Sequence, residues 1–169
     1  VATHQGKHAL MLSVAHDKTR ELIVAWIEPE ILRDLHRSIA EALARDEEDD
    51  PERLMYHFAE GGELARAGTF AVMAAGRALD ALAFDSASRL FERAIGYLSD
   101  APANQQVPIR IALADALRRA GHCRRAAVEH LYAADLCAPE ARARLCVAAG
   151  EILVTSGRLA EGLDVFGEL

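Results

Sequence analysis

A recurring spacing of small and large residues constrains how this chain folds more than any other feature. Ala87, Phe91 and Ala94 follow one another at helical spacing, and the same spacing recurs from Ala126 and from Gly162. Such offsets place the three side chains on one face of an α-helix. Small residues let two helix backbones approach, and the large side chain fills the space between one helix pair and the next. The pattern therefore predicts stacked helical units that meet along a repeated seam.

The composition favours closely packed helices over a β-sandwich. Hydrophobic residues make up 51% of the 169 residues but aromatic residues only 5%, and alanine, the best helix former, supplies much of the apolar content. Glycines and the polar stretch Ser99–Asn104 divide the sequence into segments joined by short turns. The helices predicted after residue 50 are Pro51–Glu60, Glu63–Leu82, Asp85–Leu98, Pro108–Ala120, Cys123–Cys137, Pro139–Ser156 and one from Arg158 onward.

The first fifty residues are less uniform. The run HALMLSVAH, residues 8–16, lacks helical spacing and predicts a strand or the end of a hairpin. Two helices are expected after it, and Pro29 suits the first position of the second. Asp50 is a good N-cap ahead of Pro51, and the other acidic residues of the run 46–50 suit the positive end of a helix dipole.

Over residues 63–169 these features resemble the tetratricopeptide repeat. Gly121 and Gly157 precede the second and third units at the same offset, and Gly150 occupies the small position of a first helix. The resemblance implies an all-α, right-handed solenoid of antiparallel helix pairs. The departures from the family pattern are Arg110 and Cys146 in place of tryptophan, Ala114 in place of a glycine and His130 in place of the aromatic residue.

A second resemblance extends over nearly the whole chain. The stretch HDKTRELIVAWIEPEILRDLHRSIAEALA, followed by DPERLMYHFAEGGELARAGTFAVMAAGRALDALAFDSASRLFERAI, is similar to the region after the ATPase module of large bacterial signalling proteins. Those proteins combine a serine/threonine kinase domain, a STAND-type AAA ATPase with a winged-helix-like tail, and a tetratricopeptide array. In that family, pairs that match His16-Asp17 and Arg20-Glu21 open the helix that joins the ATPase to the repeats.

The second resemblance implies a division of the chain and a function. Residues 1–50 would be the end of the winged-helix-like segment with connecting helices, and residues 51–169 the tetratricopeptide-like repeats. The function implied is a non-catalytic interaction and regulatory scaffold in a cytoplasmic kinase or ATPase, whose partner is a protein, a peptide or a neighbouring domain. The alternative is the effector-binding repeat region of a STAND-class transcriptional regulator. Kinase motifs and the loop G-x-x-x-x-G-K-[ST] are absent from these residues.

Charge and reactive residues argue against several other functions. A formal charge of −7 disfavours a nucleic-acid binder, whose affinity would need a basic face. No run of 18 apolar residues is present to span a membrane, and three cysteines without C-x2-C spacing favour reduced packing residues. The histidines form no H-E-x-x-H pair, and the acidic run 46–50 lacks the glycine of an EF-hand loop. We therefore expect no metal, no cofactor and no catalytic residue.

The remaining candidate site is the concave groove lined by the first helix of each repeat. The tetratricopeptide resemblance places six residues there, namely Asp115, Arg118, Arg119, Arg144, Glu151 and Thr155. Adjacent arginines would hold a carboxylate tail or a phosphopeptide through charge-assisted hydrogen bonds. The other interpretation, which we favour, is that Arg118 and Arg119 stabilise the end of a helix before Gly121.

The C-terminal segment carries an apolar stripe. Leu159, Leu163 and Phe166 recur at helical spacing, and Leu169 adds to them. A repeat buries such a stripe only against a neighbouring repeat, and no capping helix follows in this sequence. We therefore expect self-association through this C-terminal edge, or fraying of the helix there.

Overall fold

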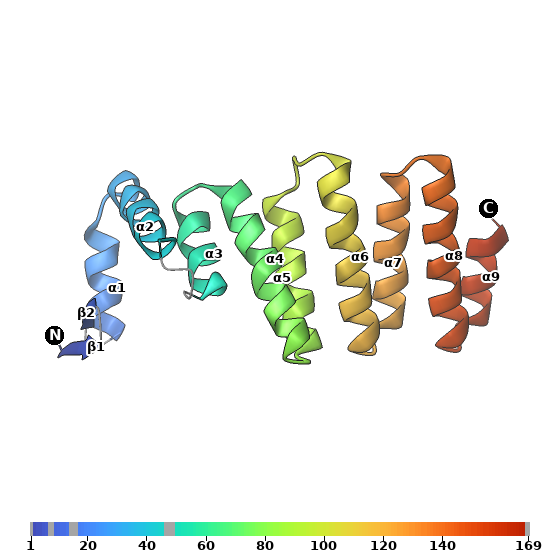
Figure 1. Ribbon diagram of the computed structural model, residues 1–169, viewed down its shortest axis with the longest axis horizontal. Coiled ribbons are helices and arrows are strands. Elements are labelled where there is room, and N and C mark those ends of the chain that lie inside the picture. The colour runs from blue at the N-terminus through green and yellow to red at the C-terminus, as the bar shows by residue number, and fades with distance from the viewer. Residues whose placement is uncertain (1, 7–8, 14–16, 46–49, 168–169) are drawn as a thin grey trace.

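Helices make up most of the described chain. The computed structural model describes residues 2–6, 9–13, 17–45 and 50–167, and from residue 17 onward each described element is a helix, as the composition predicts. Figure 1 shows α4 to α9 standing side by side in a row. The helices are α1 (Asp17–Trp26), α2 (Pro29–Leu43), α3 (Pro51–Glu60), α4 (Leu64–Asp80), α5 (Phe84–Tyr97), α6 (Ala103–Arg119), α7 (Cys123–Asp135), α8 (Pro139–Thr155) and α9 (Leu159–Gly167).

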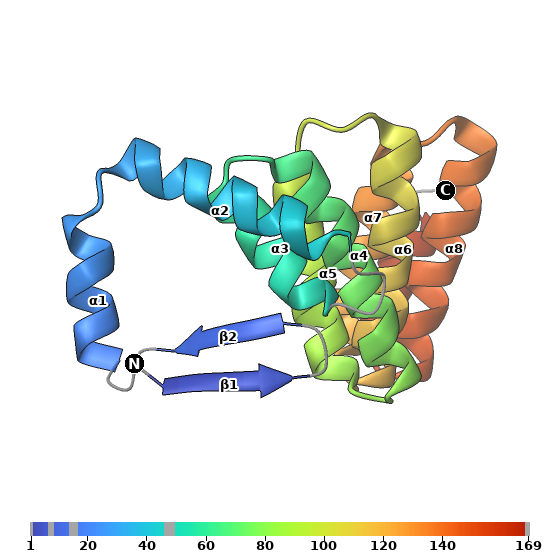
Figure 2. The same cartoon turned by 60° about the vertical axis from the view of Figure 1, so that its left-hand side comes forward.

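The N-terminal strands form a hairpin. Strand β1 (Ala2–Gly6) pairs antiparallel with β2 (Ala9–Ser13), so that Gly6 lies opposite Ala9. This pairing confirms the strand expected in the run HALMLSVAH, although positions 8 and 14–16 of that run lie outside the described residues. Figure 2 shows α1 at the N-terminal end of the molecule, apart from the row of helices.

Two helix starts follow the predicted capping chemistry. Helix α2 begins at Pro29, and α3 begins at Pro51 directly after its N-cap. The Asp50 side chain accepts a hydrogen bond from the backbone N–H of Glu52 at 3.1 Å, which satisfies one of the unpaired donors of the first turn. The rest of the acidic run, residues 46–49, lies outside the described residues.

The start of α6 differs from the prediction. The helix begins at Ala103, so Pro108 lies inside it rather than at its first position. The side-chain amide of Gln106 donates to the carbonyl oxygens of Ser99 and Ala101 at 2.9 and 2.8 Å, and these bonds tie the added turn to the preceding loop. A proline near a helix start removes one intrahelical bond only, so the helix continues through it.

The turns that end α3, α4, α6 and α8 share one hydrogen-bonding pattern. After α4, the N–H of Ala83 donates to the carbonyl of Ala78 at 2.8 Å, and the N–H of Leu82 donates to that of Leu79 at 2.9 Å. This pair of hydrogen bonds is the Schellman motif, which needs a residue in the left-handed conformation at its centre. Leu82, with φ 58°, takes that conformation after α4. Glycines take it in the other three turns, as predicted: Gly62, Gly121 and Gly157.

The alanines of the recurring pattern are buried, as predicted. Four of them have no solvent exposure, and Phe91 is only 3% exposed. The largest hydrophobic cluster joins α4, α5, α6 and α7, and smaller clusters continue it toward α2 and toward α9. The seam therefore extends from one helix to the next along the row. The four fully buried alanines are Ala87, Ala94, Ala126 and Ala133.

In the last unit, glycines permit a close approach of two helices. A Cβ on Gly162 would lie 3.0 Å from the carbonyl oxygen of Gly150, so α9 passes directly over the α8 backbone. A Cβ on Gly150 would lie 2.6 Å from the ring of Phe166. The prediction that the large residue lies between helix pairs is wrong for Phe166, because its ring packs on α8 within its own pair.

Candidate partner-binding groove

Three of the six predicted groove residues lie together near the end of α6. Arg118 Nη2 donates to Asp115 Oδ1 at 2.7 Å, and Arg119 Nε forms an ion pair with Asp115 Oδ2 at 2.7 Å. Both arginines lie in the last turn of α6, where the partial negative charge of the helix end stabilises them. The geometry thus fits the helix-end interpretation, and a carboxylate partner would compete with Asp115 for the guanidinium groups.

The other three predicted residues lie on α8. Arg144, Glu151 and Thr155 are exposed, and the Thr155 hydroxyl donates to the backbone carbonyl of Glu151 at 2.7 Å. Among the described residues, no hydrogen bond or ion pair joins these side chains to the arginines and aspartate of α6. The structure therefore assembles one charged cluster on α6 and leaves the α8 residues separate.

An apolar groove of about 480 Å³ lies between α4 and α6, with α5 contributing to its lining. Apolar side chains dominate its surface, and Met73 on α4 is 49% exposed there. An unbranched thioether of this kind adapts its shape to different partners. The principal apolar lining residues are Val72, Met73, Phe91, Leu98, Pro108 and Ile109.

Pro108 gives this groove a polar edge. Because proline has no backbone N–H, it cannot donate the helical hydrogen bond that would end on the carbonyl of Asn104. Asn104 also lines the groove. Asn104 thus adds a polar residue to a mainly apolar lining.

Sequence reasoning missed the apolar groove because it considered charged residues only. The available signal was an exposed apolar residue on each first helix. Ile111 and Val147 lie one turn before Asp115 and Glu151 and are 37% and 39% exposed. Of these exposed residues Met73 lines the groove, whereas Ile111 and Val147 lie outside its lining.

His130 on α7 faces the charged cluster of α6. Burial lowers the pKa of its imidazole, while Asp115 opposes this shift and Arg118 adds to it. Its Nδ1 atom is buried and has no hydrogen-bond partner within the described part of the chain. A neutral imidazole thus occupies the place that Phe91 takes in the preceding unit.

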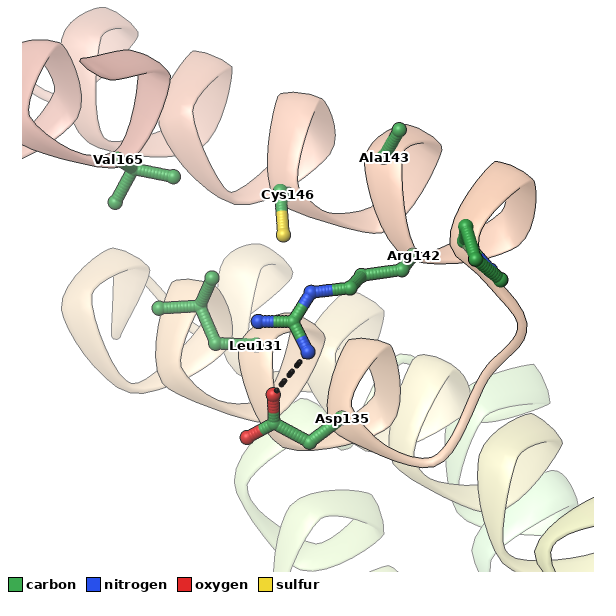
Figure 3. Close-up of a pocket in the computed structure, with 7 residues that line it drawn as sticks. Leu131, Asp135, Arg142, Ala143, Cys146 and Val165 are labelled. Carbon is green, nitrogen blue, oxygen red and sulfur yellow. Dashed lines mark ion pairs between the residues drawn. The ribbon is translucent and has the colours of Figure 1, made fainter. Parts of the chain in front are cut away.

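A second hollow, of about 500 Å³, lies among α7, α8 and α9. Figure 3 shows the sulfur of Cys146 pointing into it, toward Leu131 and the guanidinium of Arg142. Arg142 also pairs with Asp135 at 3.1 Å across the hollow. The small side chain of Cys146 leaves this space open.

Metal-ligand groups, membrane-spanning helices and disulfides were the other features considered in the sequence. Within the described ranges, no three His, Cys, Asp or Glu side chains gather into a metal site, and no helix is long and apolar enough to cross a membrane. The three cysteines form no disulfide, as their spacing predicts.

No family model, curated protein or solved structure matches the chain. Its function is therefore inferred from the groove itself.

Proposed function

We propose that this chain is a non-catalytic interaction segment that holds a peptide or protein partner in the groove between α4 and α6. The observation that carries the proposal is the apolar groove itself, whose volume of about 480 Å³ suits one or two large side chains of a partner. Burial of such an anchor would displace water from the exposed side chain of Met73.

Two observations support a tetratricopeptide-like solenoid as the scaffold. The same Schellman turn follows α4, α6 and α8, which are the first helices of three consecutive pairs. Polar contacts also link the second helices of neighbouring pairs: His122 Nε2 lies 3.1 Å from Asp85 Oδ1, and Arg124 Nε forms an ion pair with Glu161 Oε2 at 3.1 Å. Local turn geometry and the contacts between units thus both follow the repeat seen in the alanine pattern.

The proposed parent is a bacterial, cytoplasmic signalling kinase or ATPase, in which this segment couples partner binding to the catalytic modules. The sequence resemblance supports this setting, and so does an exposed apolar surface on α1 and α2. Trp26 is 84% exposed and Ile31 53% exposed. Apolar surfaces of this kind mark contacts with other domains or proteins. A neighbouring domain would pack on this surface and sense the state of the groove.

Peptide selection tests the proposed groove. Peptides selected from a random display library on the 169-residue chain should carry a large apolar residue. Their binding should weaken at least ten-fold on Met73→Glu, because the charge would be buried under the anchor. Val128→Glu is the matched control, since Val128 is 40% exposed on α7, outside the groove. Selected peptides that bind Met73→Glu as tightly as the parent would overturn the proposal.

A further inference from the structure

Two histidines from different helices face each other where α2 contacts α3. The Nδ1 atoms of His36 and His57 lie 3.1 Å apart, and the ring centroids lie 5.0 Å apart. Both residues are half-buried. Two facing imidazole nitrogens form a hydrogen bond only if one carries a proton and the other offers its lone pair. For both Nδ1 atoms to bind one metal ion, the ring that donates this hydrogen bond must move its proton from Nδ1 to Nε2.

The distance between the nitrogens matches that of two ligands on one metal ion. With a metal–nitrogen bond of about 2.0–2.1 Å, two ligands lie about 3.3 Å apart in a tetrahedral site and about 2.9 Å apart at a right angle. The observed 3.1 Å falls between these values. We propose that His36 and His57 together form a binding site for a divalent transition-metal ion of the copper–zinc class.

Neighbouring contacts hold the two imidazoles in place. The Tyr56 ring meets both edge-on, with centroids 5.5 Å from His36 and 5.2 Å from His57. Beside them, Arg37 Nη2 donates to the carbonyl of Gly61 at 3.2 Å and fixes α2 against the end of α3. The two rings are therefore held close together before a metal ion binds, which lowers the entropic cost of binding.

The site supplies two protein ligands. Within the part of the chain that the structure describes, no third His, Cys, Asp or Glu side chain gathers with them into a larger ligand group. Such a site binds Cu²⁺ more tightly than Ni²⁺ or Zn²⁺, in keeping with the general order for nitrogen ligands. Because a metal ion competes with protons for the imidazole nitrogens, the affinity falls as the pH is lowered. A bound ion would join α2 to α3 and would act independently of the groove between α4 and α6.

Calorimetry with CuCl₂ and ZnCl₂ on the 169-residue chain tests the assignment. We expect His36→Gln and His57→Gln each to weaken the tightest Cu²⁺ site at least ten-fold. His122→Gln is the matched control, because His122 is an exposed histidine bonded to Asp85 and lies far along the chain. The affinity of the His122→Gln variant for Cu²⁺ should equal that of the parent. A parental affinity in either of the first two variants would overturn the proposal.

A second measurement on the unaltered chain avoids any dependence on how the variants fold. Paramagnetic Cu²⁺ broadens the NMR signals of nearby amides, so substoichiometric Cu²⁺ should first remove the signals around His36 and His57. Zn²⁺ should also raise the melting temperature of the parent and of His122→Gln. Broadening that begins instead at the N-terminal histidines His4 and His8 would show that the ion binds elsewhere and would refute the site.

Discussion

Leu82 holds a backbone conformation that the equivalent turns assign to glycine. Its φ is 58°, while Gly121 and Gly157 have φ values of 86° and 85° in turns with the same hydrogen bonds. A Cβ in the left-handed region approaches the following carbonyl, which costs about 1–2 kcal/mol. The Leu82 side chain is 70% exposed, so burial offsets little of this cost.

Leu82→Gly should therefore stabilise the chain by about 0.5–1 kcal/mol, because relief of strain exceeds the extra freedom that glycine gives the unfolded state. Urea unfolding followed by circular dichroism measures the change. Ala81→Gly is the matched control, since Ala81 has a φ of −81° and gains nothing from glycine. That control should destabilise the chain. A lower unfolding midpoint for Leu82→Gly would mean that the leucine side chain contributes a contact that outweighs the strain.

His130 makes stability depend on pH in a defined direction. Burial lowers the pKa of its imidazole in the folded chain, with Asp115 opposing the shift and Arg118 adding to it. The unfolded state then binds a proton more readily than the folded state. Stability should fall as the pH drops below about 6.5, the ordinary value of the unfolded residue, and the loss should level off below the folded pKa.

His130→Phe should remove this part of the pH dependence and leave no buried, unpaired Nδ1 atom. We expect a gain of about 1 kcal/mol at neutral pH, since a buried polar atom without a partner is destabilising. The measurement compares urea midpoints at pH 7.5 and 5.5 in the parent, in His130→Phe and in His122→Gln. If the urea midpoint of His130→Phe changes between pH 7.5 and 5.5 as much as that of the parent, the pH dependence comes from other histidines.

The helices were largely predictable because their boundaries depend on local chemistry. Proline at a first position, aspartate as an N-cap and glycine in a turn act within a few residues, and α3 has the predicted bounds Pro51–Glu60. The start of α6 was missed because Gln106 stabilises it through carbonyls of the preceding loop, which no helical periodicity reveals. The role of Leu82 was missed because its conformation is set by the turn and not by its own preference.

The α8–α9 contact depends on a missing side chain. A Cβ on Gly150 would lie 2.6 Å from the Phe166 ring, a distance at which the ring or the helix backbone must shift. Gly150→Ala should therefore cost about 1–3 kcal/mol, despite the higher helix propensity of alanine. In a Phe166→Leu background the same change should cost less. Urea unfolding of the parent, the two single variants and the double variant gives the coupling energy between the two positions. If the free-energy changes of the two substitutions simply add, the packing of Phe166 on Gly150 is contradicted.

The candidate site was less predictable than the helices because it forms between elements distant in sequence. The charged residues of α6 could be placed on one face, yet their partner is Asp115 of the same helix. The groove beside Val72 and Ile109 requires α4 and α6 to lie together, and that arrangement follows from packing of α5 between them. Local periodicity contains no direct information on such a space.

The C-terminal edge of the row exposes leucines that no other described helix covers. Leu159 and Leu163 are 59% and 63% exposed, whereas Phe166 is half-buried against Gly150. The apolar stripe expected from the sequence thus consists of the two leucines in the described structure, and Leu169 lies outside it. Exposed apolar strips of this kind favour association with another surface.

We predict that the 169-residue chain self-associates through α9 and that Leu163→Glu reduces this association, because the carboxylate would have to lose its water in the contact. Light scattering should show a mass that rises with concentration in the parent and stays near the monomer value in the variant. Ile31→Glu is the matched control, since Ile31 is 53% exposed on α2 at the opposite end. If Ile31→Glu abolishes the association and Leu163→Glu does not, the contact lies on the N-terminal apolar surface and the α9 edge is not the interface.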